Sequence, residues 1–294
     1  MPTLVETAPA VSGPSPSMFR KNGAYWFMVL LPAVFLATLY LAPVISVMVR
    51  SVTEPVLGLG NYAVILENRA IQNVLGKTFY ICTVTTGLTL FFGYITAYAM
   101  SQVSPREQRW MFFLVILSFW ISVLIRTFAW IAVLQPRGLL NEALIWLGLI
   151  DQPLRMVRND FGVIVGMVHY MLPYAILPLF ANMQTIDRSL VPAARALGAS
   201  ARRAFFTVFL PLSLPGLAGA AILVLIFSSG FYITPALLGG GKVVMVAEYI
   251  SVQMSETLKW GLATSLATCL MLVVLALTIA MSRFMDVGSA GKSG

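Results

Sequence analysis

The chain has 294 residues, of which 59% are hydrophobic and only 10% are charged, and its mean hydropathy is +0.87. A soluble domain of this size needs more charged surface, so the composition excludes one and indicates an integral membrane protein with a single membrane domain. The net charge of +8 does not indicate nucleic-acid binding, because the basic residues are scattered between apolar runs, where membrane topology and attraction to anionic lipids explain them.

Residues 1–18 are rich in Pro, Ser, Ala and Thr and have no packing face, so they predict a disordered tail. Arg20 and Lys21 precede the first apolar run, residues 25–49. This run is too long for the core of a signal peptide, and no Ala-x-Ala site follows it directly, so it predicts a first transmembrane helix.

Five further apolar spans follow the first one. They cover about 73–100, 110–134, 161–182, 212–238 and 260–283. Each is near or above the ~20 residues that cross a ~30 Å hydrocarbon core. The sequence therefore predicts an all-α membrane domain of six helices over residues 19–285, with a short tail over residues 286–294.

Six spans place both chain ends on the same side of the membrane. With the N-terminus inside, ten of the 19 basic residues lie in inner segments, close to the ends of the spans, a distribution that favours two cytoplasmic termini only weakly. The outer loops, about 51–72, 135–160 and 239–259, then carry seven of the 11 acidic residues. Two interpretations stay open: this charge attracts a cationic solute, or solvated loops simply carry charges.

No catalytic or metal-binding constellation is visible in the sequence. His169 is the only histidine, and such a residue in an apolar span more often donates or accepts a hydrogen bond to a neighbouring helix than binds a metal. A phosphate-binding loop needs a glycine five residues before its Gly-Lys pair, and Gly241-Lys242 and Gly291-Lys292 have Ala236 and Asp286 there. We expect no ATPase site, cofactor or metal on this chain.

Arg126 lies inside an apolar run, 119–130, where an arginine at a helix centre costs about 2.5–3.5 kcal/mol on insertion scales. It is either a functional group of a transport pathway or a residue near the outer interface that snorkels past Trp120 and Trp130. The further candidates for a pathway are aromatic or polar residues in the spans, although ordinary helix packing is the alternative for each. They are Trp120, Trp130, Tyr170, Tyr174, Phe231, Tyr232 and Thr234.

The basic loop between the fourth and fifth spans predicts a short helix, a glycine break, a second helix and a proline stop. Pro192 suits the first turn of a helix, where its missing N–H is not needed. At about 100° per residue, Leu190, Ala194 and Leu197 share one face, opposite Arg188 and Arg195. Gly198 suits a left-handed turn, and Pro211 is the expected stop.

This loop resembles the cytoplasmic loop of ABC importer membrane subunits, with the pattern Glu-Ala-Ala, three residues, Gly, nine residues, Ile-x-Leu-Pro. Ala193, Ala194 and Gly198 match it, as do Val208 and the pair Leu210-Pro211, while Pro192 stands where the family usually has Glu. The resemblance implies a type I importer permease fold (MetI-like). It also implies a cytoplasmic loop over about 187–211, with Arg195 in it, that couples the permease to an ATPase. This implied position of the loop is the main reason to place both termini in the cytoplasm.

Two further segments, 120–130 with Gly138 and Asn141 after it, and 230–240, are similar to the spermidine/putrescine subgroup of these permeases. The resemblance implies import of a small polar solute, a polyamine, across a bacterial inner membrane. The implied partners are a second, similar permease, two ATP-binding subunits that hold ATP and Mg, and a periplasmic solute-binding protein. An opine, amino-acid-like or phosphonate solute remains the alternative. Scarce buried carboxylates argue against an ion-gradient transporter, and the missing catalytic constellation argues against an enzyme.

Overall fold

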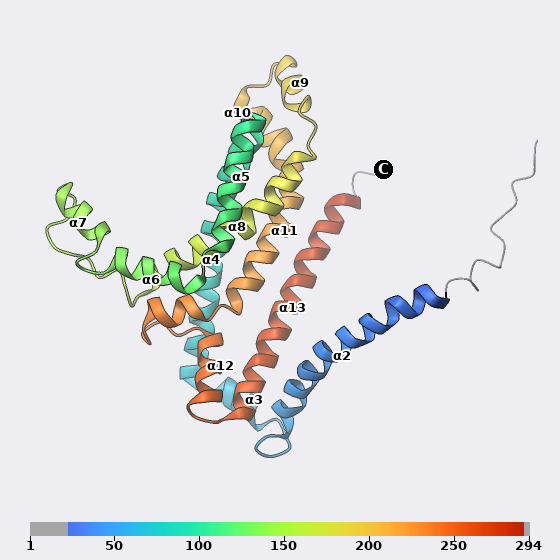
Figure 1. Ribbon diagram of the computed structural model, residues 1–294, viewed down its shortest axis with the longest axis vertical. Coiled ribbons are helices and arrows are strands. Elements are labelled where there is room, and N and C mark those ends of the chain that lie inside the picture. Colours follow the sequence, from blue (N-terminus) through green and yellow to red (C-terminus); the bar gives the residue numbers. More distant parts are fainter. Residues whose placement is uncertain (1–22, 291–294) are drawn as a thin grey trace, which may run out of the picture. The chain divides into compact units, whose positions relative to one another are not determined.

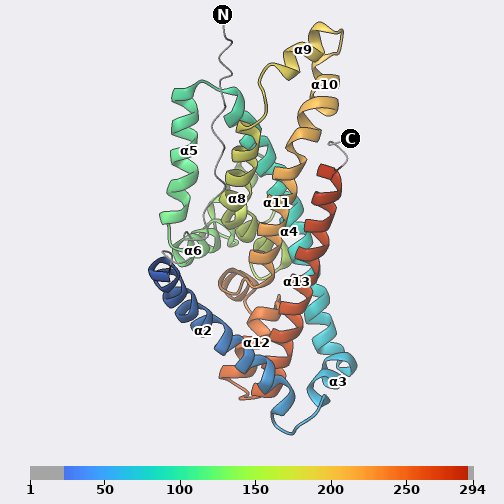
Figure 2. The same cartoon turned by 90° about the vertical axis from the view of Figure 1, so that its right-hand side faces the viewer.

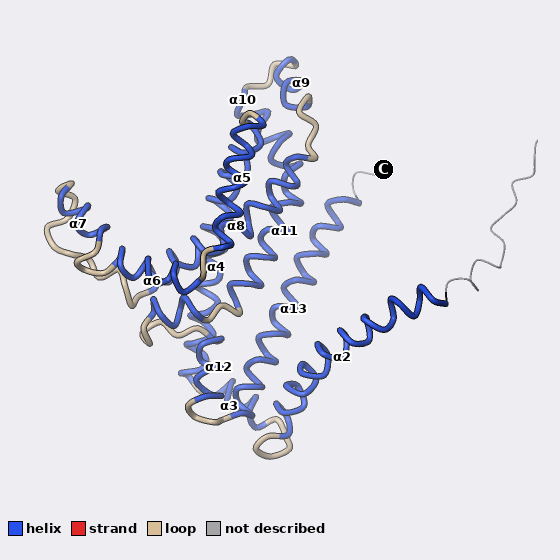
Figure 3. Tube along the Cα trace, viewed as in Figure 1, coloured by secondary structure: helices blue, strands red, loops and turns tan. Residues whose placement is uncertain are grey.

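The computed structural model describes residues 23–290, and all regular elements in this part are helical (Figure 3). The chain divides into two units, Met1–Val49 and Arg50–Gly294, each described by itself. The described residues of the first unit all belong to α2 (Gly23–Thr53), an apolar helix that contains Pro32 and Pro43 and ends a few residues beyond Val49. The predicted tail over residues 1–18 lies outside the described residues.

The second unit holds the other helices, of which η1 and η2 are π-helical turns. In chain order they are α3 (Gly60–Glu67), α4 (Arg69–Gln102), α5 (Pro105–Trp120), α6 (Val123–Leu134), α7 (Leu139–Trp146), α8 (Asp160–Gln184), α9 (Leu190–Ala196), α10 (Ala201–Ala204), η1 (Phe205–Phe209), α11 (Leu210–Ser229), η2 (Pro235–Gly239), α12 (Val246–Ser255) and α13 (Trp260–Ala290).

Helices α4, α8 and α11 pack against one another and form the centre of this unit (Figures 1 and 2). Small residues let their backbones approach closely, as is common between membrane helices. A Cβ added at Gly93 on α4 would lie 2.9 Å from the Cβ of Ala175 on α8. One added at Gly216 on α11 would lie 2.5 Å from the Cβ of Asn182. Helix α13 packs beside α11 and against α12.

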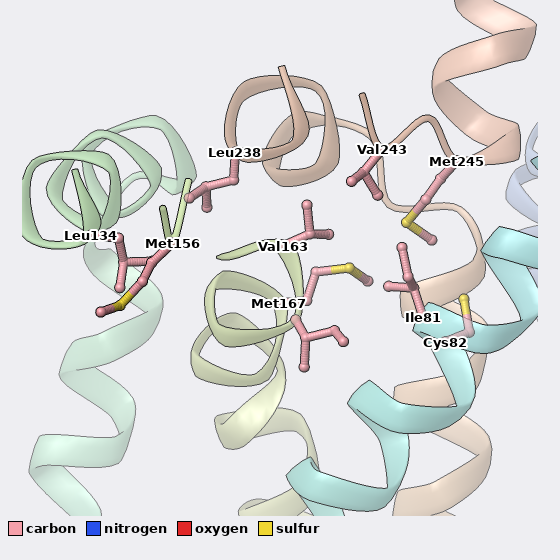
Figure 4. Packing of buried hydrophobic residues seen from close by; sticks show 10 residues of the cluster. Ile81, Cys82, Leu134, Met156, Val163, Met167, Leu238, Val243 and Met245 are labelled. Atoms are coloured by element: carbon pink, nitrogen blue, oxygen red, sulfur yellow. The ribbon is translucent and has the colours of Figure 1, made fainter. Parts of the chain in front are cut away.

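Three buried clusters lie in the described part of this unit, and the smallest consists of Ile65, Ile71 and Leu266. The first joins α4, α6, α8 and η2 through apolar side chains (Figure 4): Ile81, Cys82, Leu134, Met156, Val163, Ile164, Met167, Leu238, Val243 and Met245. The second lies toward the end that carries α9 and α10. It contains Ala97, Met100, Met171, Ala175, Ile176, Leu179, Met183, Phe209, Ala220 and Val224.

Six helical segments of the described chain are long and apolar enough to span a membrane, which confirms the predicted number. Two predicted boundaries are wrong. The span 110–134 is not continuous, because α5 ends at Trp120 and α6 begins at Val123; the third candidate span is Val123–Trp146. The span 212–238 ends early, since α11 stops at Ser229 and Pro235 opens the separate turn η2.

Candidate functional site

A break between α5 and α6 is the centre of the candidate site. Ile121 and Ser122 have extended backbone angles, so the last carbonyls of α5 lack the amide partners that a continuing helix would supply. Arg126, one turn into α6, reaches back to them. Its Nη2 atom donates to the carbonyl oxygens of Ile121, at 2.8 Å, and Ser118. The guanidinium therefore caps the end of α5.

The same guanidinium is held inside the protein. Arg126 is only 8% exposed, and its Cζ atom lies 4.9 Å from the ring centroid of Tyr170 on α8. A cation over an aromatic face is attracted by the ring quadrupole. Among the described residues, the ion pairs are Arg50–Glu54 and Lys77–Asp160, so Arg126 has no carboxylate partner there.

A cavity of about 250 Å³ opens beside this break. Residues 119–123 form one wall, and Arg126, Tyr170 and Tyr174 form the other. The structure thus brings together four of the predicted pathway residues, since Trp120 belongs to the first wall. The cavity has an aromatic lining and one buried cation.

Ring contacts extend this wall toward α11. Tyr170 packs on Phe231, with centroids 4.6 Å apart, and Tyr174 packs on Phe227 at 4.6 Å and on Phe119 at 5.1 Å. Sequence reasoning found Phe231 and missed Phe119 and Phe227. The available signal for Phe119 was the pair Ser118 and Ser122, which interrupts an apolar run at the point where the helix breaks.

Three predicted pathway residues lie elsewhere. Nε1 of Trp130 donates to Nδ1 of His169 at 3.1 Å, which confirms the expectation that this histidine bonds to a neighbouring helix. Thr234 is buried and shares a hydrogen bond of 3.3 Å with Thr127. Tyr232 is 44% exposed and does not line the cavity.

The basic loop has the predicted helix and glycine break. Helix α9 contains Pro192 in its first turn, and Gly198 has a φ of +91°. Before α9, the N–H of Ser189 donates to Oδ1 of Asp187 at 2.9 Å. This backbone hydrogen bond holds the pKa of the Asp187 carboxyl below its ordinary value.

The structure adds the orientation of α9 and corrects the predicted proline stop. The face shared by Leu190, Ala194 and Leu197 is not the one held against the bundle, a direction that the sequence left open: Val191 packs against the second cluster, whereas Leu197 is 91% exposed. Pro211 does not stop a helix: it lies in the first turn of α11, directly after the π-helical turn η1. Proline has no N–H, so Pro211 makes no bond to the carbonyl of Thr207. The N–H of Leu210 just before it donates to Phe205, five residues back, rather than to Phe206.

The loop also carries an open depression of about 550 Å³ between α9 and α10. Its lining includes Pro192, Arg195 and Gly198, together with Val191 and residues 199–201. Of the residues that match the family pattern, only Gly198 lines this depression. The depression lies at one end of the helical bundle, the end opposite α3 and α12 (Figure 1).

Six apolar spans, an aromatic cavity at a broken helix and a glycine-broken helical loop define a membrane-spanning subunit of a solute transporter. Residues 89–288 match the family described as "Binding-protein-dependent transport system inner membrane component", and the chain belongs to this family. It is therefore an inner-membrane permease subunit of an ABC importer, that is, a transport subunit.

Curated relatives cover most of the chain. It is 34% identical over 212 residues to the spermidine/putrescine transport system permease protein PotB of Haemophilus influenzae, covering 71% of this chain and 74% of the relative. It is 31% identical over 229 residues to PotB of Escherichia coli K12, covering 77% and 83%. A crystal structure of a bacterial alginate ABC transporter matches with a TM-score of 0.74 at 16% identity, covering 91% of this chain and 96% of that one. This last similarity shows the fold alone.

Proposed function

We propose that this permease subunit serves the import of a polyamine such as putrescine or spermidine. The observation that carries the proposal is the 34% identity to a permease named for spermidine and putrescine, over 74% of that relative's length. The aromatic cavity supports it, because Trp120 and Tyr174 in its lining bring aromatic rings to an organic ammonium group.

The loop around α9 is the proposed contact to the ATPase. Helix α9 is held to the bundle by Val191, and Leu197 after it points outward. The loop then continues through α10 and η1 into α11. When two ATP-binding subunits close on ATP and Mg, a short helix seated on them moves as a body and tilts the helix that follows it. This is a hinge-type switch between two states of the pathway.

The remaining partners are proposed on the same basis. A second, similar permease completes the membrane part as a heterodimer, and a periplasmic solute-binding protein delivers the solute. Both termini then lie in the cytoplasm, so that the α9 loop faces the ATPase. This chain binds no cofactor of its own in this scheme.

A second candidate solute class is amino-acid-like, opine or phosphonate. It is favoured by one observation: Arg126 lines the cavity without a carboxylate partner among the described residues. A buried guanidinium attracts a carboxylate or phosphonate group and repels an ammonium group.

Uptake by the complete complex in liposomes tests the proposal and separates these classes. Labelled putrescine or spermidine is added outside with the binding protein, and ATP is enclosed with the ATPase. The proposal is supported if the labelled polyamine is taken up and if neither an amino-acid-like zwitterion nor an organic anion competes with this uptake. If the complex takes up the zwitterion or the anion and no polyamine, the proposed solute is wrong, and the assignment to the ABC importer permeases is unaffected.

A further inference from the structure

The break between α5 and α6 is not explained by a helix-breaking residue. Residues 117–127 contain neither proline nor glycine, and the apolar run through them favours one continuous helix. Inside a membrane a continuous helix also satisfies its own backbone groups, which a break does not. Something else must stabilise the bent form.

Arg126 supplies what the break lacks. Its Nη2 atom donates to two carbonyls of the α5 end, those of Ser118 and Ile121, while Nη1 lies 3.4 Å from the Ser118 hydroxyl. These carbonyls carry the negative end of the α5 dipole, so they also offset the charge of the guanidinium. In a straight helix the same arginine would lie among apolar residues without these partners.

The same residue ties the break to the helices that flank the α9 loop. Its guanidinium lies over Tyr170 of α8, and the neighbouring Tyr174 contacts Phe119 at the end of α5 and Phe227 of α11. Helices α8 and α11 are the two that the loop connects. A displacement of α8 and α11 therefore reaches the break through direct contacts.

We propose that Arg126 is a positioning residue: it holds the α5–α6 segment bent and links the bend to α8 and α11, so that movement of the α9 loop opens and closes the cavity wall at residues 119–123. Figure 1 shows α6 turning away from the axis of α5. The transport part of this proposal rests on the proposed function, whereas the bend does not depend on it.

Spin labels test the bend directly. With Cys82 and Cys269 replaced by Ala, labels are attached at exposed positions of the two helices, Phe113→Cys on α5 and Phe128→Cys on α6. A continuous helix would separate these positions by about 22 Å, at 1.5 Å per residue, and the bend brings them closer. We expect Arg126→Leu to lengthen the distance toward that value and Arg126→Lys to keep most of the bend.

Transport by the assembled complex is measured on the same variants without labels. We expect Arg126→Leu to lower uptake at least tenfold while the ATPase rate of the complex stays within twofold, and Arg126→Lys to recover part of the uptake. Arg137→Leu, the same change at an exposed position between α6 and α7, should alter neither measurement. Fast ATP hydrolysis without uptake is a result that general destabilisation does not give.

An unchanged label distance in Arg126→Leu overturns the proposal, and so does normal uptake by a straightened variant. If the complex with Arg126→Leu does not assemble, the same two measurements are made on Arg126→Gln. The glutamine amide can donate to one carbonyl of the α5 end, but it carries no charge. A longer distance and reduced uptake then support the proposal, and values equal to the unsubstituted protein overturn it. If the unsubstituted complex takes up no polyamine, the proposed solute is wrong, and the label distance still tests the role of Arg126.

Discussion

The Nζ atom of Lys77 on α4 lies 2.8 Å from Oδ2 of Asp160, the first residue of α8, although the two are 83 positions apart in the chain. The side chains are 39% and 34% exposed, so the pair lies partly open at the surface of the protein. It joins the first part of α4 to the start of α8, at the end of the bundle opposite the α9 loop (Figure 1).

We expect a double-mutant cycle of Lys77→Met and Asp160→Asn to give a coupling free energy of about 0.5–1 kcal/mol, typical of exposed ion pairs. Thermal unfolding in detergent at low and high salt measures it, and the coupling should fall with salt. Exchange of the two charges should recover less than the full value, because Lys at position 160 would oppose the dipole of α8. A coupling above 2 kcal/mol, or one that salt does not weaken, would contradict this account.

Two glycines of α4 provide a matched test of helix packing. A Cβ at Gly93 would press on the Cβ of Ala175, while a Cβ at Gly87 would meet nothing within 4 Å. We expect Gly93→Ala to destabilise the fold by roughly 1–3 kcal/mol through overpacking. Gly87→Ala should be neutral, or stabilising by up to ~1 kcal/mol, because it favours the helix. Thermal unfolding of the two purified variants measures these effects. Equal effects of the two changes would contradict the close contact at Gly93.

The number of helical spans could be predicted from the sequence because hydropathy alone controls it. The break at Ile121 and Ser122 could not, since local preference favours a straight helix and the bend depends on contacts of Arg126 with α5 and Tyr170. Such contacts between helices carry no periodic signal. An arginine in an apolar run indicated that position 126 was special without indicating what it binds.

The α9 loop shows the same difference between features that local sequence determines and features that depend on contacts between helices. Gly198 and Pro192 were predicted correctly, because positive φ and a missing N–H are local backbone properties. The inward face of α9 could not be predicted, because it depends on how the helix lies against the bundle: Val191 is turned inward and Leu197 outward. Helical periodicity gives the spacing of a face and not its direction.

Gly198→Val tests the glycine turn. Gly198 has a φ of +91°, and an added Cβ would meet nothing within 4 Å, so the expected effect comes from the backbone, about 1–2 kcal/mol for a side chain in the left-handed region. We expect the variant to reach the membrane normally, to retain less ATPase on purification and to lose uptake. Gly198→Asn should be milder, because asparagine tolerates this conformation.

The matched control for this turn is Gly219→Val on α11, where a Cβ also meets nothing within 4 Å and the backbone is helical. It makes the same chemical change without the positive φ and should leave ATPase association unchanged. Normal uptake by Gly198→Val would remove the glycine turn from the coupling mechanism.

Pro192→Glu tests the departure from the family pattern. Position 192 lies in the first turn of α9, where an acidic residue is favourable by about 0.3–1 kcal/mol because it faces the positive end of the helix dipole. The fold should therefore accept the change, and a carboxylate at the ATPase surface should leave docking as it is or tighten it. Ala196→Glu, in the last turn of the same helix, is the control and should weaken docking, since a negative charge there opposes the dipole. Titration of the reconstituted permease with ATPase at two salt concentrations measures both variants. Weaker docking by Pro192→Glu than by Ala196→Glu would mean that this loop meets its ATPase through a surface that excludes the acidic residue.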